Sequence, residues 1–387
     1  MTAPEPRHPR VLHVAHYCLP HLGGLETVVG AETRGLTARG WDVSLLSSAL
    51  GAPAGVRNEH GVRTLRLRAW GCLEQRFGVP FPIFTPWLLV ALWREVRRAD
   101  VVHVHDPLYL TSWVAAFWCL VLRTPYVVHR HVGFVHHSSL VVRLVQRLVL
   151  GTFARPVLSG AAAILPIDEF IAAGTRATMR PSTRVEVLGN GVDTERFRPA
   201  EPGEQRQLRE GLGLPLDLPL ALFVGRFVPK KGFAEVAAAA SDRYGIVFAG
   251  GDRPPGLGDG RLHFVGAVSA EDMPAVYRAA DVMVVASVGE CPLTVLEAMS
   301  SGIPVLANDD PALHSPWTSG PGVRFVDVAA GRLRKALEGL VASAAELRDV
   351  GAAGHDFVQE SFSWEAHLDR LEQVYREVLV RRSAQAG

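Results

Sequence analysis

The sequence has no long hydrophobic run, no excess of one charge and no cysteine pattern, and each absence excludes a class of protein. The longest uncharged apolar run, about residues 108–122, is shorter than the ~20 residues that a membrane-spanning helix needs. With 40 Lys and Arg against 39 Asp and Glu, the overall charge gives no reason to expect a nucleic-acid partner. Cys18, Cys72, Cys119 and Cys291 are scattered along the chain, as in proteins of a reducing cytosol.

The sequence also shows no internal repeat and no low-complexity tract, so it is not expected to be a repeat protein or a disordered chain. Residues 1–10 are polar and proline-rich and lack the apolar centre of a secretory signal, so a cytoplasmic location is expected. High usage of Ala, Arg, Gly and Val is typical of a GC-rich bacterial genome. At 387 residues, of which 48% are hydrophobic, the chain is long enough for two domains with separate cores.

Strand-like apolar runs alternate with helix-like segments through both halves of the chain. This alternation predicts an α/β protein with parallel sheets and crossover helices. The expected strands are residues 10–15, 42–47, 63–67, 101–105, 126–131, 161–166 and 184–188, followed by 220–224, 246–249, 262–265, 282–286 and 303–307. A segment rich in Pro, Gly and charge, residues 190–205, reads as an interdomain linker. We therefore expect two Rossmann-like doubly wound domains, 1–198 and 199–363.

The last segment, residues 364–387, has the pattern of an amphipathic helix. Its apolar positions recur at spacings of three and four, so one stripe of the helix is expected to be buried. These positions are Leu368, Leu371, Val374, Tyr375 and Val378.

Two motifs in the second half follow predicted strands, where doubly wound sheets bind ligands. The first runs from Gly225 to Gly232 and carries Arg226 and Lys231. A guanidinium and an ammonium on a glycine-bounded turn suit an anion such as a diphosphate, although surface charge is the usual role of such residues.

The second motif, residues 287–299, carries Glu290 on a loop and Glu297 on the helix that follows. Carboxylates at these positions, around Pro292, are suited to hold hydroxyl groups. The alternative is that Glu290 is a solvated loop residue and that the helix dipole favours Glu297. Cations for a diphosphate beside carboxylates for a sugar indicate a nucleotide-sugar pocket.

Gly23 and Gly24, on the loop between the first strand and the first helix, would let backbone N–H groups approach a ligand. The alternative is a tight turn capped by Glu26. Asp309 and Asp310 form the only acidic pair after a strand, and we interpret them as a helix-initiating loop rather than as metal ligands.

Histidines occur in close pairs at 103/105, 129/131 and 136/137. Residues two apart on a strand share a face without converging, and no acidic or cysteine partner stands at ligand spacing. We therefore expect most of them to be ordinary polar residues at strand ends, and no metal site. His131, which ends an apolar strand, is the one candidate for function.

With these motifs the chain resembles the retaining nucleotide-sugar glycosyltransferases of family 4, which have the GT-B fold. The resemblance covers nearly the whole length. Its motifs are the loop ending at Glu26, the strand ending at His131, Asn190-Gly191-Val192-Asp193 with Phe197 and Pro199, Gly225-Arg226 with Lys231-Gly232, Phe264-Val265-Gly266, Ala280-Asp281, and Glu297-Ala298-Met299 with Gly302-Ile303-Pro304-Val305.

The resemblance implies roles for several residues. Arg226 and Lys231 would bind the donor diphosphate, Glu297 the ribose, and His131 would lie near the 6-hydroxyl of the donor sugar. Backbone amides after Pro292, at Leu293 and Thr294, would face the phosphates and the sugar, and the C-terminal helix would cross back to the first domain. One departure concerns Glu290, which stands seven residues before Glu297 where the family has eight. We expect Glu290 still to contact the sugar.

The resemblance also implies a mechanism without a protein nucleophile, in which preorganised cations stabilise the leaving diphosphate. We therefore expect no cofactor and no metal requirement. The expected reaction moves a hexose of the glucose or N-acetylglucosamine type from a UDP-sugar to a small soluble acceptor, such as an aminocyclitol or another natural-product scaffold, as in antibiotic biosynthesis. A lipid-linked or cell-surface glycan acceptor, a nucleotide-sugar epimerase and a non-catalytic nucleotide-sugar-binding protein are the alternatives.

Contact with a membrane is considered because residues 140–150, with Arg143 and Arg147, have the pattern of an amphipathic helix. It is not favoured, since the polar face has few cations. The sequence gives no indication of an oligomeric state.

Overall fold

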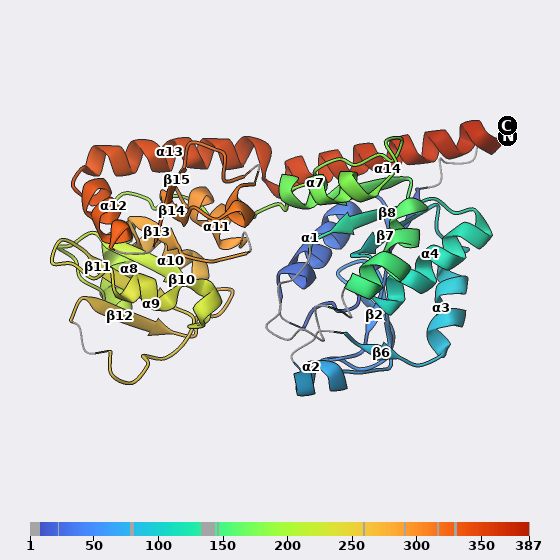
Figure 1. Cartoon of the computed structure of the whole chain (residues 1–387), viewed down its shortest axis with the longest axis horizontal. Coiled ribbons are helices and arrows are strands. Elements are labelled where there is room, and N and C mark those ends of the chain that lie inside the picture. Colours follow the sequence, from blue (N-terminus) through green and yellow to red (C-terminus); the bar gives the residue numbers. More distant parts are fainter. Residues whose placement is uncertain are drawn as a thin grey trace. The chain divides into compact units, whose positions relative to one another are not determined.

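The chain folds into two α/β units (Figure 1). The computed structural model describes residues 8–21, 23–77, 81–132, 144, 147–257, 260–289, 292–315, 317–328 and 331–386. Unit 1 comprises residues 1–189 together with 367–387, and unit 2 comprises residues 190–366. The sequence placed these divisions at 198/199 and 363/364 instead.

Unit 1 is built on a seven-stranded sheet with the order β3-β4-β2-β1-β7-β8-β9. Its strands are β1 (Arg10–Val14), β2 (Asp42–Ser48), β3 (Gly55–Glu59), β4 (Val62–Leu67), β7 (Val101–His105), β8 (Tyr126–Arg130) and β9 (Ala163–Pro166). All neighbouring pairs are parallel except β3 and β4. A separate antiparallel pair consists of β5 (Ala69–Trp70) and β6 (Ile83–Phe84).

Helices cover both faces of this sheet. Successive strand residues point to opposite sides, so neighbouring residues of one strand belong to different core clusters. Val11 packs in one core cluster, with residues of α1 and α14, and Leu12 packs in another, with residues of α3 and α4. The helices of unit 1 are α1 (Gly24–Ala38), α2 (Cys72–Phe77), α3 (Trp87–Val96), α4 (Leu110–Leu122), the π-helix η1 (Leu150–Ala154), α6 (Arg155–Ser159), α7 (Glu169–Thr178) and α14 (Trp364–Ala386).

Helix α14 lies beside α1 on one face of the unit 1 sheet (Figure 1). Leu371, Val374 and Tyr375 are fully buried, together with Leu368 and Val378. All five pack against β1, β2, β7 and β8. The predicted stripe and its return to the first half of the chain are therefore confirmed.

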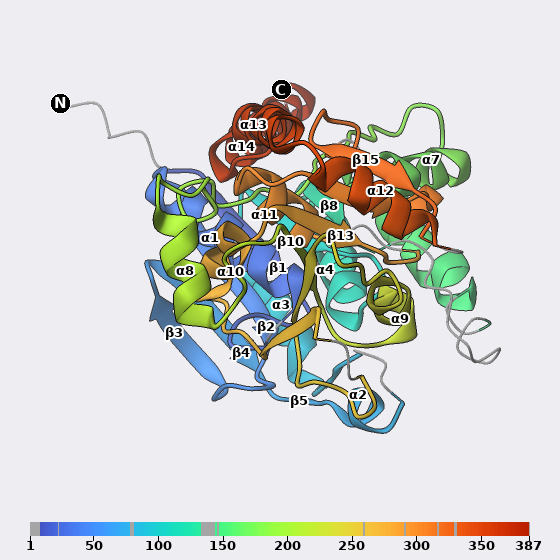
Figure 2. The same ribbon diagram turned by 90° about the vertical axis from the view of Figure 1, so that its left-hand side faces the viewer.

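Unit 2 has a six-stranded sheet, all of its pairs parallel, with the order β12-β11-β10-β13-β14-β15. Its strands are β10 (Leu220–Val224), β11 (Gly245–Ala249), β12 (Leu262–Gly266), β13 (Val282–Val285), β14 (Val305–Asn308) and β15 (Val323–Val326). Its helices are α8 (Glu204–Leu212), η2 (Pro229–Lys231), α9 (Phe233–Ala237), α10 (Met273–Ala279), α11 (Thr294–Ser300), η3 (Pro311–Leu313), α12 (Arg332–Val341) and α13 (Ala344–Ser361). Helix α8 packs on α10, and α11 packs on α13 (Figure 2).

The predicted α/β class with two doubly wound parallel sheets is confirmed. Strands β3, β5, β6 and β15 were not predicted. The residues of β3 are exposed and polar, so the sequence shows no apolar alternation there. Residues 184–188, which were expected to form a strand, make only an isolated bridge between Val185 and Ile164. Among the described residues, none of the helices combines the length and the apolarity needed to cross a bilayer.

Candidate functional site

The loop between β10 and α9 is held tightly against the end of the neighbouring strand β13. Gly225 and Gly232 have φ angles of +142° and +71°, which favour glycine. A Cβ on Gly232 would collide with the carbonyl oxygen of Ala286, just after β13. The sequence Gly-x₆-Gly is therefore required by the close approach of two loops at one edge of the sheet.

Phe227 anchors this loop in the core of unit 2. Its ring stacks on Phe233 with centroids 4.4 Å apart, and it meets Phe248 and Phe264 edge-on. The preceding residue, Arg226, is exposed. Within the part of the chain that the structure describes, its guanidinium has no hydrogen-bond or ion-pair partner. A rigid loop thus presents a cation without a local counter-charge.

Lys231 belongs to the same loop and is half-buried. Its side-chain carbons lie 3.7–3.9 Å from the position that a Cβ on Gly225 would occupy. The lysine stem therefore lies over the end of β10. Only a residue without a side chain at position 225 leaves this space fully open.

The loop after β13 lies directly beside residues 225–232, the cationic loop. The backbone N–H of Val288 donates to the carbonyl oxygen of Lys230 at 3.0 Å. The N–H of Gly289 donates to Oδ1 of Asp310 at 3.3 Å, and the Asn308 amide donates to the Ser287 carbonyl at 3.3 Å. The loops that follow β10, β13 and β14 therefore meet at one edge of the unit 2 sheet.

Asp309 and Asp310 take the structural role predicted for them. Asp310 caps the short helix η3, and its carboxylate accepts from the N–H of Ala312 at 2.9 Å. Asp309 lies 2.9 Å from the Nε2 of His314. The prediction of a helix-initiating loop is confirmed.

Three predicted residues lie at the start of α11, while Glu290 lies outside the described residues. Pro292 accepts from the N–H of Val295 at 3.1 Å, and Leu293 accepts from the N–H of Glu297 at 3.2 Å, so both carbonyls are used by the first helical turn. The hydroxyl of Thr294 is buried and has no hydrogen-bond partner among the described residues. Thr294 therefore has unused hydrogen-bonding capacity.

Glu297 is oriented by a residue that the sequence analysis missed. The hydroxyl of Tyr277, on α10, donates to Oε2 of Glu297 at 2.6 Å. Burial raises the pKa of the Glu297 carboxyl above its usual range, and it also raises the pKa of Tyr277. The only signal for Tyr277 in the sequence was its position on the helix before a predicted strand.

Gly23 and Gly24 lie in unit 1, at the start of α1. Gly23 is the N-cap residue, and a Cβ there would collide with the carboxylate of Glu26, which folds back over this helix end. Nδ1 of His21 lies 2.8 Å from Oε1 of Glu26. Glu26 thus lies in the first turn of α1, beside the N-cap residue, where its charge suits the helix N-terminus.

His131 follows β8 and is half-buried. Its backbone N–H donates to Oδ1 of Asp106 at 3.0 Å, and its Nε2 lies 3.1 Å from Nδ1 of His105. Burial and the neighbouring His129 lower the pKa of His131 well below its usual value. The imidazole is therefore neutral at physiological pH.

The expectation that the other histidines do not converge is wrong for His103, His105 and His129, whereas His136 and His137 lie outside the described residues. His103 and His105 on β7 and His129 on β8 all turn toward the carboxylate of Glu32 on α1. The reason is the register of the parallel strands, which pairs His13 with His103 and His105 with His129. Considering each strand alone could not reveal pairs formed between strands.

Two family models match the chain. The model described as Glycosyltransferase Family 4 matches residues 22–196, and the model described as Glycosyl transferases group 1 matches residues 219–349. The first lies almost wholly in unit 1 and the second wholly in unit 2.

The chain is also similar to curated proteins named as a sugar-phosphate synthase and as a glycosyltransferase. The chain is 29% identical over 221 residues to an alpha-maltose-1-phosphate synthase of Mycolicibacterium smegmatis, covering 50% of the chain and 57% of the relative. It is 34% identical over 224 residues to a D-inositol 3-phosphate glycosyltransferase of Mycolicibacterium paratuberculosis, covering 51% and 48%. The matches thus span about half the length of these relatives.

Solved structures share the fold over nearly the whole chain. A sucrose-phosphate synthase from Thermosynechococcus elongatus superposes with a TM-score of 0.75 at 21% identity, covering 97% of this chain and all of that one. Anabaena HepE in complex with UDP superposes with a TM-score of 0.73 at 16% identity, covering 95% and 100%. With the two family models matching its two halves, the chain belongs to the family 4 glycosyltransferases of the GT-B type.

Proposed function

We propose that the protein is a retaining hexosyltransferase that moves glucose or N-acetylglucosamine from a UDP-sugar to a hydroxyl of a small soluble acceptor. The observation that carries this proposal is the hydrogen bond between Val288 N–H and the Lys230 carbonyl. It brings the cationic loop, residues 225–232, beside the loop that leads into α11. The cations of the first loop and the hydroxyl-binding carboxylate of α11 then lie at the same edge of the unit 2 sheet.

In this proposal Arg226 and Lys231 hold the diphosphate of the donor. Negative charge increases on the diphosphate as its bond to the sugar breaks, so the two cations stabilise the transition state more than the ground state. The support is the exposed guanidinium of Arg226, which has no partner among the described residues, on a loop that Phe227 fixes. A preorganised cation costs no rearrangement when the charge develops.

The same two cations lead us to propose that transfer needs no divalent metal. Transfer should therefore proceed undiminished in EDTA, and added magnesium or manganese should not increase its rate. Loss of activity in EDTA that magnesium restores would contradict this part of the proposal.

Glu297 is proposed to hold the ribose of the donor. Tyr277 donates to Oε2, which fixes the carboxylate and leaves Oε1 to accept from a ligand hydroxyl. A hydroxyl donor would also offset part of the unfavourable burial of this acid.

Glu290 is proposed to orient the donor sugar. Loss of a group that only orients the sugar should lower turnover more than nucleotide affinity. Glu290→Gln and Glu297→Gln should therefore be compared for UDP binding and for transfer. Near-normal transfer by Glu290→Gln would remove this residue from the site.

His131 is proposed to lie against the donor sugar near its 6-hydroxyl. The neutral state of its imidazole supports this role, since a neutral ring can exchange hydrogen bonds with a sugar without carrying a buried charge. For Gly23 and Gly24 the proposal is that their N–H groups face the donor.

The acceptor is proposed to be a polyol or aminocyclitol. Two relatives are named for sugar or inositol phosphates, which supports a hydroxyl-rich, small acceptor, phosphorylated or not.

The proposed location of the protein is the cytoplasm. The described cysteines, Cys18, Cys72 and Cys119, are free thiols, which supports this location.

An acceptor screen tests the proposal. The protein is incubated with UDP-glucose or UDP-N-acetylglucosamine and a panel of inositols, sugar phosphates and aminocyclitols, and products are read by mass spectrometry. The anomeric configuration of a product, read by NMR, tests retention. Tight UDP binding with no product from any acceptor would favour a non-catalytic binding protein, and conversion of donor without acceptor would indicate an epimerase.

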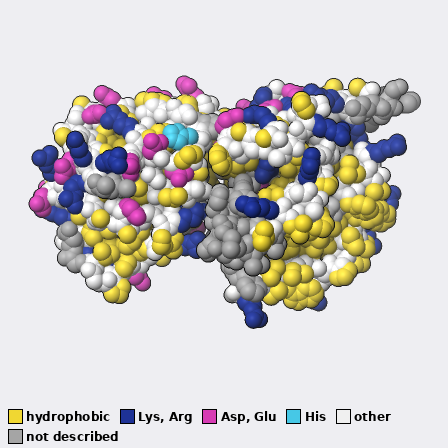
Figure 3. Space-filling view, in the orientation of Figure 1, with side chains coloured by type: hydrophobic (Ala, Val, Ile, Leu, Met, Phe, Trp, Pro, Cys, Tyr) yellow, Lys and Arg dark blue, Asp and Glu magenta, His cyan; other side chains and the backbone are white. Residues whose placement is uncertain are grey.

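A lipid-linked acceptor is the second candidate, because one face of unit 1 exposes large apolar side chains (Figure 3). Trp87 and Leu89 on α3 and Phe117, Leu120 and Val121 on α4 are each about half exposed. Such a patch is typical of interaction surfaces. Co-sedimentation with lipid vesicles that Phe117→Ser abolishes, together with transfer only to lipid-linked glycans, would favour this candidate.

A further inference from the structure

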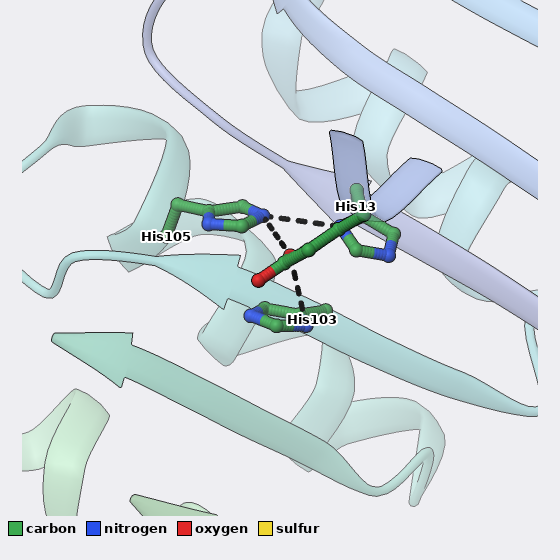
Figure 4. A group of neighbouring side chains, drawn as sticks. His13, His103 and His105 are labelled. Carbon is green, nitrogen blue, oxygen red and sulfur yellow. Dashed lines mark hydrogen bonds and ion pairs between the residues drawn. The ribbon is translucent and has the colours of Figure 1, made fainter. Parts of the chain in front are cut away.

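Unit 1 contains a cluster of ionisable side chains that the proposed transfer reaction does not use. It consists of His13 on β1, His103 and His105 on β7, and Glu32 on α1 (Figure 4). The exposure of all four side chains is 0%. Buried imidazoles and a buried carboxylate are costly unless their polar atoms are satisfied.

The parallel strands bring the three imidazoles together on one face of the sheet. His13 pairs with His103 across β1 and β7, and His105 follows two residues later on the same face. Their ring centroids lie 4.7 Å apart for His13 and His103 and 4.3 Å apart for His103 and His105. Figure 4 shows the three rings close together. Helix α1 covers this face, and Oε2 of its Glu32 lies within 4.0 Å of a nitrogen of each ring.

The spacing of the ligand atoms is that of a tetrahedral metal site. Oε2 of Glu32 lies 3.6 Å from His13 Nδ1, 3.6 Å from His105 Nε2 and 4.0 Å from His103 Nδ1. His13 Nδ1 lies 3.0 Å from His105 Nε2. In a zinc site with bonds of about 2.0–2.1 Å, neighbouring ligand atoms stand ~3.3 Å apart. The observed distances bracket this value.

Hydrogen bonds within the protein leave the carboxylate oxygen at this centre unsatisfied. Oε2 of Glu32 is buried and has no hydrogen-bond partner among the described residues. The other carboxylate oxygen, Oε1, is served separately by His367, whose Nε2 lies 3.0 Å away, and by His129, whose Nδ1 lies 3.1 Å away. A carboxylate oxygen surrounded by ring nitrogens, without a hydrogen bond, is the arrangement that a cation would complete.

The outer contacts of two of the histidines allow a tautomer whose lone pairs point inward. Nδ1 of His105 lies 3.1 Å from Nε2 of His131, and Nε2 of His13 lies 3.4 Å from the hydroxyl of Tyr375. When His105 and His13 donate through these nitrogens, His105 Nε2 and His13 Nδ1 are both lone-pair atoms. They then face each other and Glu32 with no proton between them. Outer hydrogen bonds of this kind orient the histidine ligands of metal sites.

From this arrangement the geometry points to a structural binding site for a divalent transition metal, zinc by its chemistry, held by His13, His105 and Glu32 with His103 as the fourth ligand. Imidazole and carboxylate ligands suit zinc and related ions, whereas magnesium and calcium prefer oxygen ligands alone. The hydroxyl of Tyr375 lies 2.5 Å from His103 Nδ1, so it occupies this nitrogen until the metal takes it.

The site is structural because its ligands are fully buried and come from separate elements of the unit. One ion would tie β1 and β7 to α1. Through Oε1 of Glu32 and His367, the same carboxylate also reaches α14. The proposal departs from the expectation of no metal site, and it is independent of the proposed transferase activity.

Metal analysis of the full chain, purified without a polyhistidine tag, tests the proposal. Elemental mass spectrometry should find about one zinc per chain, the content of one four-ligand site. Protein refolded from denaturant with a chelator should melt at lower temperature, and zinc or cobalt, but not magnesium, should restore the melting temperature. Bound cobalt should give the visible absorption of a tetrahedral site.

Variants separate the site from adventitious binding. Glu32→Gln and His105→Gln should lose the bound metal and the zinc-dependent shift in melting temperature. His355→Gln is the control, because His355 lies in unit 2 and its Nδ1 lies 2.7 Å from the Ser300 carbonyl oxygen; it should retain both. If the Glu32 and His105 variants fail to fold, the cobalt spectrum of the unmodified chain decides. Metal-free protein whose melting temperature is indifferent to zinc and cobalt would show that the cluster is a hydrogen-bonded network only.

Discussion

Replacing Arg226 with alanine should weaken UDP binding without weakening the fold. The side chain is exposed and has no partner among the described residues, so its removal leaves no buried group unsatisfied. Surface substitutions of this kind usually change stability by within about 0.5 kcal/mol. A charge-assisted hydrogen bond to a ligand contributes about 1.5–3 kcal/mol, which corresponds to a loss of UDP affinity of ~10- to 150-fold.

Calorimetric titration with UDP at two salt concentrations measures this loss. Because the guanidinium is exposed, its attraction for a diphosphate is screened by salt, so the difference between Arg226→Ala and the unmodified protein should narrow at high ionic strength. Arg243→Ala is the matched control. Arg243 is also exposed and in unit 2, but it precedes β11 and so lies at the opposite edge of the parallel sheet.

Three results would refute the reasoning about Arg226. Arg226→Ala could bind UDP as tightly as the unmodified protein, Arg243→Ala could lose as much affinity, or the melting temperature of Arg226→Ala could fall as far as its affinity. The first two outcomes would place the diphosphate elsewhere. The third would mean that the side chain supports the loop rather than the ligand.

Further predictions concern stability. Burial raises the pKa of Glu297 above its ordinary 4.5. The protonated side chain therefore contributes to the stability of the folded protein below about pH 4.5, and this contribution is lost as the pH rises through the folded-state pKa. Glu297→Gln, which can keep the Tyr277 contact, should therefore melt higher than the unmodified chain at pH 7 but not at pH 4; a constant difference in thermal melts across this range would contradict it. Leu371→Ala, in the buried stripe of α14, should cost about 2–5 kcal/mol in denaturant unfolding, and a cost below 1 kcal/mol would show that α14 packs loosely. Gly232→Ala should destabilise the protein by more than about 1 kcal/mol, because of its positive φ and the close Ala286 carbonyl; an unchanged melting temperature would argue against that close approach.

The sequence predicts most strands, because each is a short run of β-branched and apolar residues that is buried on both faces. It also predicts the buried stripe of α14, because the spacing of Leu368 and Leu371 repeats the helical period. The exposed β3 escaped prediction because only packing against β4 makes it a strand. A strand can therefore be predicted from its local sequence where both of its faces are buried, but not where it is polar and lies at the edge of the sheet.

The cationic loop could be located from sequence because its glycines, its cations and the preceding strand are contiguous. Tyr277 and Glu32 could not, because each approaches its partner from a helix distant in sequence. The convergence of His13 with His103 depends on register between strands, which no single segment encodes. Long-range pairing therefore sets the limit of what one sequence reveals here.

The position of α14 has a consequence for the order in which the protein is synthesised. Unit 1 begins with the first strand, yet its core includes Leu371, Val374 and Tyr375, which leave the ribosome after the whole of unit 2. Domains generally fold as units during synthesis, so unit 2 can reach its native state while unit 1 still exposes the apolar face that α14 will cover. The earlier-made unit must therefore wait for the later one, and during that interval it is the part of the nascent chain most exposed to aggregation and to chaperones.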